Sequence, residues 1–141
     1  MANHVATADV EIAASAGRVW TALTDPAEIK TYFGTDVETD WKPGSAIVWR
    51  GEYEGTTYED KGEILEVEPG RRLKMTHFSP MSGQPDEPDN YHTVSYDLAE
   101  RGAATHVSLS QDNNADEAEA ERASATWATL LAGLKSAVEG A

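Results

Sequence analysis

A chain of 141 residues, 40% hydrophobic and 26% charged, has the length and composition of one ordinary globular domain, so residues 1–141 are expected to form a single domain. Its net charge of −14 argues against binding to nucleic acid or anionic membranes, because both depend on Lys and Arg. The absence of cysteine excludes disulfides, a thiolate nucleophile and a Cys-based metal site.

The N-terminal quarter predicts a strand followed by two short helices. Val5–Ile12 alternates loosely, as a strand does. Ser15 is typical of a helix N-cap. Pro26 disfavours helical geometry in the residue before it, so it ends the first helix and suits the first turn of a second one. That second helix should run through Phe33 and end at Gly34, a residue that adopts the left-handed conformation easily.

The middle of the chain has a hydrophobic period of about two, which predicts strands. Turn residues separate them at short intervals, and this pattern favours antiparallel hairpins. The predicted strands are Asp36–Trp41, Ser45–Tyr53, Tyr58–Glu68, Arg71–Ser79, Tyr91–Glu100 and Thr105–Asp112. One longer connection, Pro80–Asn90, contains three prolines and three carboxylates, and is expected to form an exposed flap at one end of the sheet.

One long amphipathic helix is predicted over about Asn114–Glu139, with Asn114 as cap and Glu117 completing a capping box. Its apolar face is small in the first half and bulky in the second: Ala120, Ala123, Trp127, Leu131, Leu134 and Val138. The small half is expected to leave room above the sheet and the bulky half to close it. Such a helix must bury its apolar stripe, and the antiparallel sheet is its available partner.

Several segments resemble the Bet v 1-like, or START-like (SRPBCC), superfamily, in the branch related to the C-terminal domain of the Hsp90 ATPase activator. They are Ile12–Pro26, Trp41–Ser45, Gly62–Leu73, Asn90–Leu98, Thr105–Asn114 and the helix around Trp127. The resemblance implies an α+β helix-grip fold, in which a curved seven-stranded antiparallel sheet surrounds a long C-terminal helix. Members bind hydrophobic small molecules, cyclise polyketides or act as cochaperones. The activator itself carries a further N-terminal domain, so the resemblance does not by itself imply an Hsp90 function.

Strand parity predicts which side chains face the helix. The inward set on the sheet includes Trp49, Met75, His77, His92 and Tyr96, opposite Trp127 and Leu131 of the helix. An aromatic lining with a few polar tips is what a small-molecule pocket needs. The alternative is that the same side chains pack together as a filled core.

His77 and His92 are the pair considered for acid–base chemistry, since histidine titrates near neutrality. Polar contacts to a ligand or to the backbone are the simpler interpretation, and no catalytic residue is predicted. A zinc site would need a third ligand such as Glu52 or Glu63, and the spacing supports neither a metal nor another cofactor.

Three functions follow as hypotheses. The first is a binding protein for a hydrophobic or aromatic small molecule. The second is a cyclase- or hydrolase-type enzyme that uses His77, His92 or Tyr96 in the same cavity. The third is an interaction protein resembling an Hsp90 cochaperone. A homodimer through the edge strand Asp36–Trp41 is conceivable, although the charges of that strand oppose association.

No apolar run reaches the ~20 residues that cross a bilayer, and no basic region followed by an apolar stretch opens the chain. A cytoplasmic protein is therefore expected. The acidity has two interpretations: solubility or adaptation to a salty cytoplasm, or an acidic docking face for a basic partner.

Overall fold

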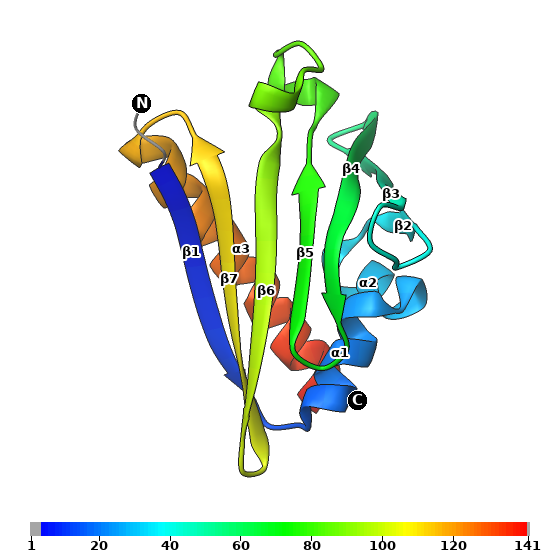
Figure 1. Cartoon of the computed structure of the whole chain (residues 1–141), viewed down its shortest axis with the longest axis vertical. Coiled ribbons are helices and arrows are strands. Elements are labelled where there is room, and N and C mark those ends of the chain that lie inside the picture. The colour runs from blue at the N-terminus through cyan, green and yellow to red at the C-terminus, as the bar shows by residue number, and fades with distance from the viewer. Residues whose placement is uncertain (1–3, 141) are drawn as a thin grey trace.

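The computed structural model describes residues 4–140, and shows a curved antiparallel sheet with one long helix lying across its concave face (Figure 1). The strands are β1 His4–Ile12, β2 Asp36–Glu38, β3 Ala46–Tyr53, β4 Thr56–Glu68, β5 Arg72–His77, β6 His92–Arg101 and β7 Ala104–Asn114. Their order across the sheet is β1-β7-β6-β5-β4-β3-β2, with every pair antiparallel. The predicted seven-stranded helix-grip architecture is confirmed.

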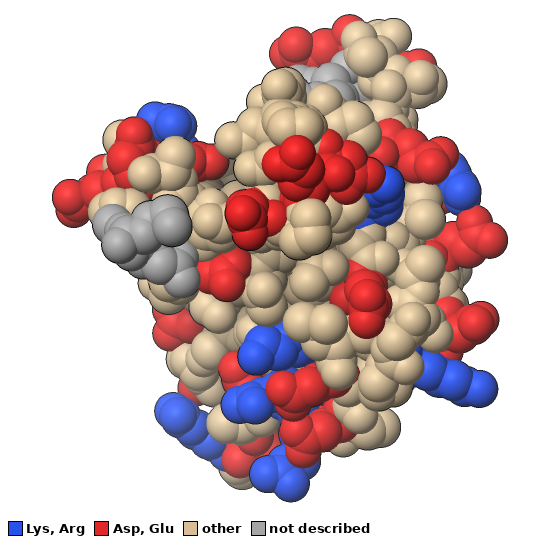
Figure 2. Space-filling model, turned by 45° about the horizontal axis from the view of Figure 1, so that its top comes forward, with Lys and Arg blue, Asp and Glu red and all other residues tan. Residues whose placement is uncertain are grey.

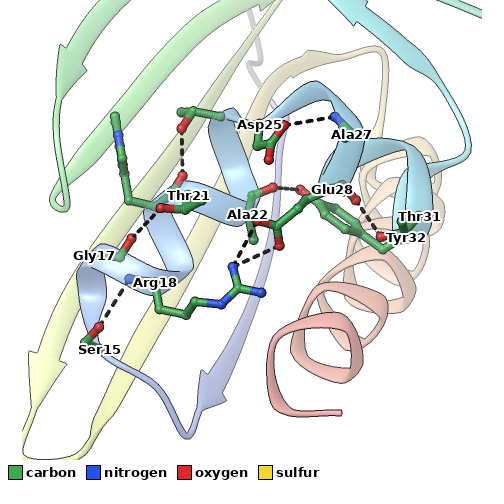
Figure 3. A network of polar contacts seen from close by, with 12 residues as sticks. Ser15, Gly17, Arg18, Thr21, Ala22, Asp25, Ala27, Glu28, Thr31 and Tyr32 are labelled. Carbon is green, nitrogen blue, oxygen red and sulfur yellow. Dashed lines mark hydrogen bonds and ion pairs between the residues drawn. The ribbon is translucent and has the colours of Figure 1, made fainter. Parts of the chain in front are cut away.

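Two short helices, α1 Ala16–Thr24 and α2 Pro26–Phe33, connect β1 to β2, and local chemistry fixes their ends (Figure 3). The Ser15 hydroxyl accepts a hydrogen bond from the Arg18 amide at 3.2 Å, so it is the predicted N-cap. The Asp25 carboxylate caps α2 by accepting from Ala27 N at 3.0 Å. Gly34, with φ of 75°, ends α2 in the left-handed conformation as predicted.

The early helices are also tied to each other. The Tyr32 hydroxyl donates to the carbonyl oxygen of Ala22 at 2.9 Å, and Arg18 pairs with Glu28 at 2.8 Å (Figure 3). The tyrosine is partly buried against the core, and its bond holds α2 against α1. These contacts set the position of α2 beside the concave face of the sheet.

The long helix α3 spans Glu117–Glu139, and its predicted cap is wrong by two residues. Asp116 is the N-cap, since its side chain accepts from Glu119 N at 2.8 Å, and the Glu119 carboxylate accepts in return from Ala115 N. Asn114 instead ends β7, where its buried amide donates to the carbonyls of His4 and Gln111. Pairing with β1 therefore extends β7 through the segment expected to start the helix.

The predicted strand Asp36–Trp41 is also too long. Pairing with β3 stops at Glu38, and Trp41, beyond the last paired residue, lies in the left-handed region with φ of 57°, outside the range of extended strand backbone. Arg71–Ser79 is shortened in the same way, because β5 ends at His77 and only an isolated bridge between Phe78 and Lys61 follows.

The Pro80–Asn90 segment projects from the end of the sheet above β5 and β6 (Figure 1) and is exposed along most of its length, as predicted. It contains two short 3-10 turns, Pro80–Ser82 and Pro88–Asn90. Several polar contacts anchor it: Asp86 pairs with Lys61 and accepts from the Tyr91 hydroxyl at 2.6 Å, and Asn113 donates to the Asp89 carbonyl at 2.7 Å.

Carboxylates are spread over the face shown in Figure 2, with Lys and Arg interspersed mainly towards its lower end. Many charged side chains of the protein form exposed ion pairs, for example Arg50 with Glu38 and Glu59, and Arg72 with Asp97. No helix within residues 4–140 has the length and apolar character needed to cross a membrane.

Candidate functional site

A cavity of about 450 Å³ lies between the sheet and the helices, over β2 to β6. Its walls come from α1, α2, β2 to β6, α3 and the neighbouring loops. The lining residues are Leu23, Ile29, Tyr32, Phe33, Thr35, Val37, Trp41, Ile47, Trp49, Tyr58, Asp60, Leu73, Met75, His77, Ser79, Val94, Tyr96, Thr126 and Trp127. The volume is in the range of small-molecule sites.

The position of helix α3 determines which strands of the sheet the cavity lies over. It packs directly on β1, where the Thr7 amide donates to the Ser124 hydroxyl at 3.0 Å. Ala120 is buried, and neither it nor Ala123 lines the cavity. The expectation that these alanines leave room for a ligand is therefore wrong: small side chains let the helix approach the sheet closely, and the space opens beyond Thr126 and Trp127.

The cavity brings together most of the residues predicted to line it, from strand parity and from the apolar face of the long helix. Trp49, Met75, His77, Tyr96 and Trp127 all line it. Their inward orientation agrees with the pattern of buried residues on β3, β5 and β6. Their role in binding a ligand stays a prediction.

The other two predicted residues lie outside the lining. Leu131 is fully buried in the core between α3 and the sheet. His92 is partly buried, stacks on His77 with ring centroids 6.5 Å apart, and places Nδ1 2.8 Å from the carbonyl oxygen of Asp112. It therefore lies beside His77 on the same face of the sheet, as its cross-strand partner, but outside the cavity lining.

Asp60 and His77 form the polar end of the cavity. The His77 Nε2 and Asp60 Oδ2 atoms are 2.9 Å apart, and the two side chains are 27% and 15% exposed. The Trp49 ring packs edge-on against the imidazole at 5.0 Å between centroids. Parity along Tyr58–Glu68 would have placed Tyr58 and Asp60 on the inward face, but the carboxylate gave no reason to expect burial.

Trp127 is held in a fixed orientation at the α3 side of the cavity. Its indole Nε1 donates to the side-chain oxygen of buried Gln111 at 2.9 Å. The Phe33 ring meets it edge-on, with centroids 6.5 Å apart. Phe33 is 37% exposed, so the Phe33–Trp127 contact lies where the cavity wall reaches the surface.

Two tyrosines add polar tips that do not ionise at neutral pH. Burial raises the pKa of Tyr96. Burial, and then the nearby Tyr96 and Glu28, raise the pKa of Tyr32. Both side chains are thus neutral phenols, suited to hydrogen bonding but not to acting as bases. No group of three or more His, Asp or Glu side chains able to hold a metal ion occurs among the described residues.

A curved antiparallel sheet gripping one long helix, with an aromatic-walled cavity between them, defines a helix-grip protein. The family described as "Activator of Hsp90 ATPase homolog 1-like protein" matches this chain over residues 13–139. The chain therefore belongs to that family, within the Bet v 1-like superfamily. No curated protein matches the chain.

Solved structures agree with this placement. ChR145 from Cytophaga hutchinsonii is 45% identical with a TM-score of 0.85, the match covering 96% of this chain and 94% of that one. The Aha1 dimer from Colwellia psychrerythraea is 20% identical with a TM-score of 0.75, covering 99% and 97%. DynU16, from the dynemicin biosynthetic locus, is 20% identical with a TM-score of 0.80, covering 96% of this chain and 47% of that one. The latter two show likeness of fold alone.

Proposed function

We propose that this protein binds a small apolar or aromatic molecule in the cavity between the sheet and α3. The observation that carries the proposal is the aromatic wall of a cavity of about 450 Å³. Seven of its lining side chains are aromatic: Tyr32, Phe33, Trp41, Trp49, Tyr58, Tyr96 and Trp127. Apolar walls with a few convergent polar groups are typical of sites that enclose a small ligand.

The direct test is native mass spectrometry of the protein purified from its own host. A ligand bound in the cavity should appear as an added mass that a cavity-filling substitution removes. Val94→Phe introduces bulk into the cavity wall from β6, where Val94 is 3% exposed. Ser95→Phe is the matched control, because the adjacent strand residue points to the opposite face. An added mass retained equally by both variants would place the ligand elsewhere.

The enzyme hypothesis finds less support in this geometry. Of its three candidate groups, His92 lies outside the lining and Tyr96 is held neutral by burial. His77 remains, paired with Asp60. If the protein is a cyclase or hydrolase, replacing His77 by Gln should abolish turnover of its substrate, and a fully active variant would exclude this role.

The family name supplies a second candidate, interaction with an Hsp90-type chaperone. It predicts that the purified protein stimulates the ATPase of the chaperone from the same host. A homodimer is a related candidate, because the Colwellia relative is described as a dimer. The edge strand β2 is charged, with Asp36 paired to Lys30 and Glu38 to Arg50. Light scattering during size-exclusion chromatography would determine the oligomeric state.

A further inference from the structure

The polar end of the cavity holds the Asp60 carboxylate, which accepts hydrogen bonds and cannot donate them. His77 Nε2 lies 2.9 Å from Asp60 Oδ2, so Nε2 carries a proton and donates it to the carboxylate. Neither His77 Nδ1 nor Asp60 Oδ1 has a protein partner within the described part of the chain. Buried polar atoms without partners are rare, and the carboxylate oxygen Asp60 Oδ1 can be satisfied only by a donor.

The cavity also lacks a positive counter-charge. Among the described residues that line it, Asp60 is the one carboxylate, and no lysine or arginine occurs. An anionic group brought to this end would lose its hydration and lie beside a carboxylate, without a cation to balance it. Fatty acids, aromatic acids and phosphate esters are therefore poor ligands.

The walls around this end suit a flat ring. Trp49 packs against the imidazole of His77, and Tyr58 and Trp41 belong to the same lining. On the opposite side Trp127 is fixed by its bond to Gln111, so its ring needs little ordering when a ligand binds. Aromatic pairs favour offset or edge-on contacts with a bound ring.

We infer that the ligand is an aromatic compound without negative charge that carries a hydroxyl or amine group, and that this group donates a hydrogen bond to the Asp60–His77 pair. The inference rests on the proposed function, since it names the chemistry of the molecule that the cavity takes. It gives Asp60 a defined role: the carboxylate accepts from a donor and rejects an anion.

Three probes of nearly equal size separate the effect of a hydrogen-bond donor from the effect of a negative charge: naphthalene, naphthol and naphthoate. Binding of each is measured by isothermal titration calorimetry to the wild type and to Asp60→Asn. The matched control is Asp9→Asn, because Asp9 pairs with His106 at 3.0 Å in a second Asp–His pair that does not line the cavity.

The wild type should bind naphthol about tenfold more tightly than naphthalene, the size expected of a hydrogen bond to a charged acceptor, and should bind naphthoate more weakly than either. Asp60→Asn should reduce the preference for naphthol severalfold and strengthen the binding of naphthoate. Asp9→Asn should behave as the wild type does.

Naphthoate binding to the wild type as tightly as naphthol overturns the inference, even if Asp60→Asn does not fold. A naphthol preference that Asp60→Asn leaves unchanged also overturns it. In both cases the proposed function, binding of an aromatic molecule, is still supported. If none of the three probes binds, the inference and the proposed function fail together.

Discussion

Gly62 shows how one residue without a side chain allows two strands to approach. A Cβ atom at this position would lie 1.8 Å from the carbonyl oxygen of Thr76 on β5. The contact falls next to the Asp60–His77 pair, close to the irregular pairing between Ile64 and Glu66. The close approach brings the carboxylate of β4 within reach of the imidazole of β5.

Gly62→Ala should therefore lower the free energy of unfolding by about 3 kcal/mol, because backbone atoms must move to remove the clash. The measurement is urea unfolding followed by circular dichroism. Gly17→Ala in α1 is the control, since a Cβ there would meet only Ser15 Oγ, 4.0 Å away, and a gain of up to about 1 kcal/mol is expected. Equal stability of the two variants would contradict the close approach of β4 and β5 at Gly62.

At the scale of the element, the start of α3 shows that the cap role predicted for Asn114 belongs to Asp116, while Asn114 ends β7. Asp116→Ala should lower stability by about 1 kcal/mol, the usual loss for an N-cap, and should speed amide exchange in the first turn of α3. Asn114→Ala should instead speed exchange around His4, because its buried amide bonds that carbonyl. Hydrogen exchange measured by NMR distinguishes them; exchange at the first turn in both variants would restore Asn114 as the cap.

The other end of α3 is tied to the β1–α1 connection by Glu139. Its carboxylate accepts from the Ala13 amide and from Lys135, each at 2.7 Å. The Ala13 bond, followed by Lys135, lowers the pKa of Glu139 below its usual value of 4.5. A carboxyl whose pKa falls on folding stabilises the protein above its unfolded pKa, and this contribution is lost as pH falls through the folded pKa.

Glu139→Gln should thus be less stable than the wild type at neutral pH, and the difference should shrink as pH falls below 4.5. Urea midpoints measured across this range test it. Glu121→Gln, an exposed residue on the same helix, should show no such trend. A difference between Glu139→Gln and wild type that stays constant with pH would contradict the role given to this carboxylate.

For the whole molecule, the net charge of −14 is the dominant property, and carboxylates are spread over the face in Figure 2. Their mutual repulsion destabilises the compact state. Potassium chloride at about 1 M, where the Debye length is about 3 Å, should raise the melting temperature relative to low salt. Differential scanning calorimetry measures this, and a lower melting temperature in salt would show that the surface ion pairs outweigh the repulsion.

Local chemistry explains how much of the fold the sequence predicted. Some signals depend only on residues that are close in the sequence: the hydrophobic period, the helix cap at Ser15 and the helix end at Gly34. The order and type of the elements could therefore be predicted without the structure. The predicted boundaries were wrong where pairing with a strand distant in the sequence sets the end of the element. Pairing with β1 retained Asn114 in β7, and the loss of pairing with β3 after Glu38 ended β2.

The candidate site, like the fold, was predicted in part from local sequence rules and decided in part by tertiary packing. By itself the sequence determined which side chains face inward, because alternation along a strand is a local rule, and Trp49, Met75, His77 and Tyr96 all follow it. Only the tertiary structure decided where the space opens, since that depends on how closely α3 packs on β1. It alone also joined Asp60 to His77, because their distance depends on the strand register and on the close approach at Gly62.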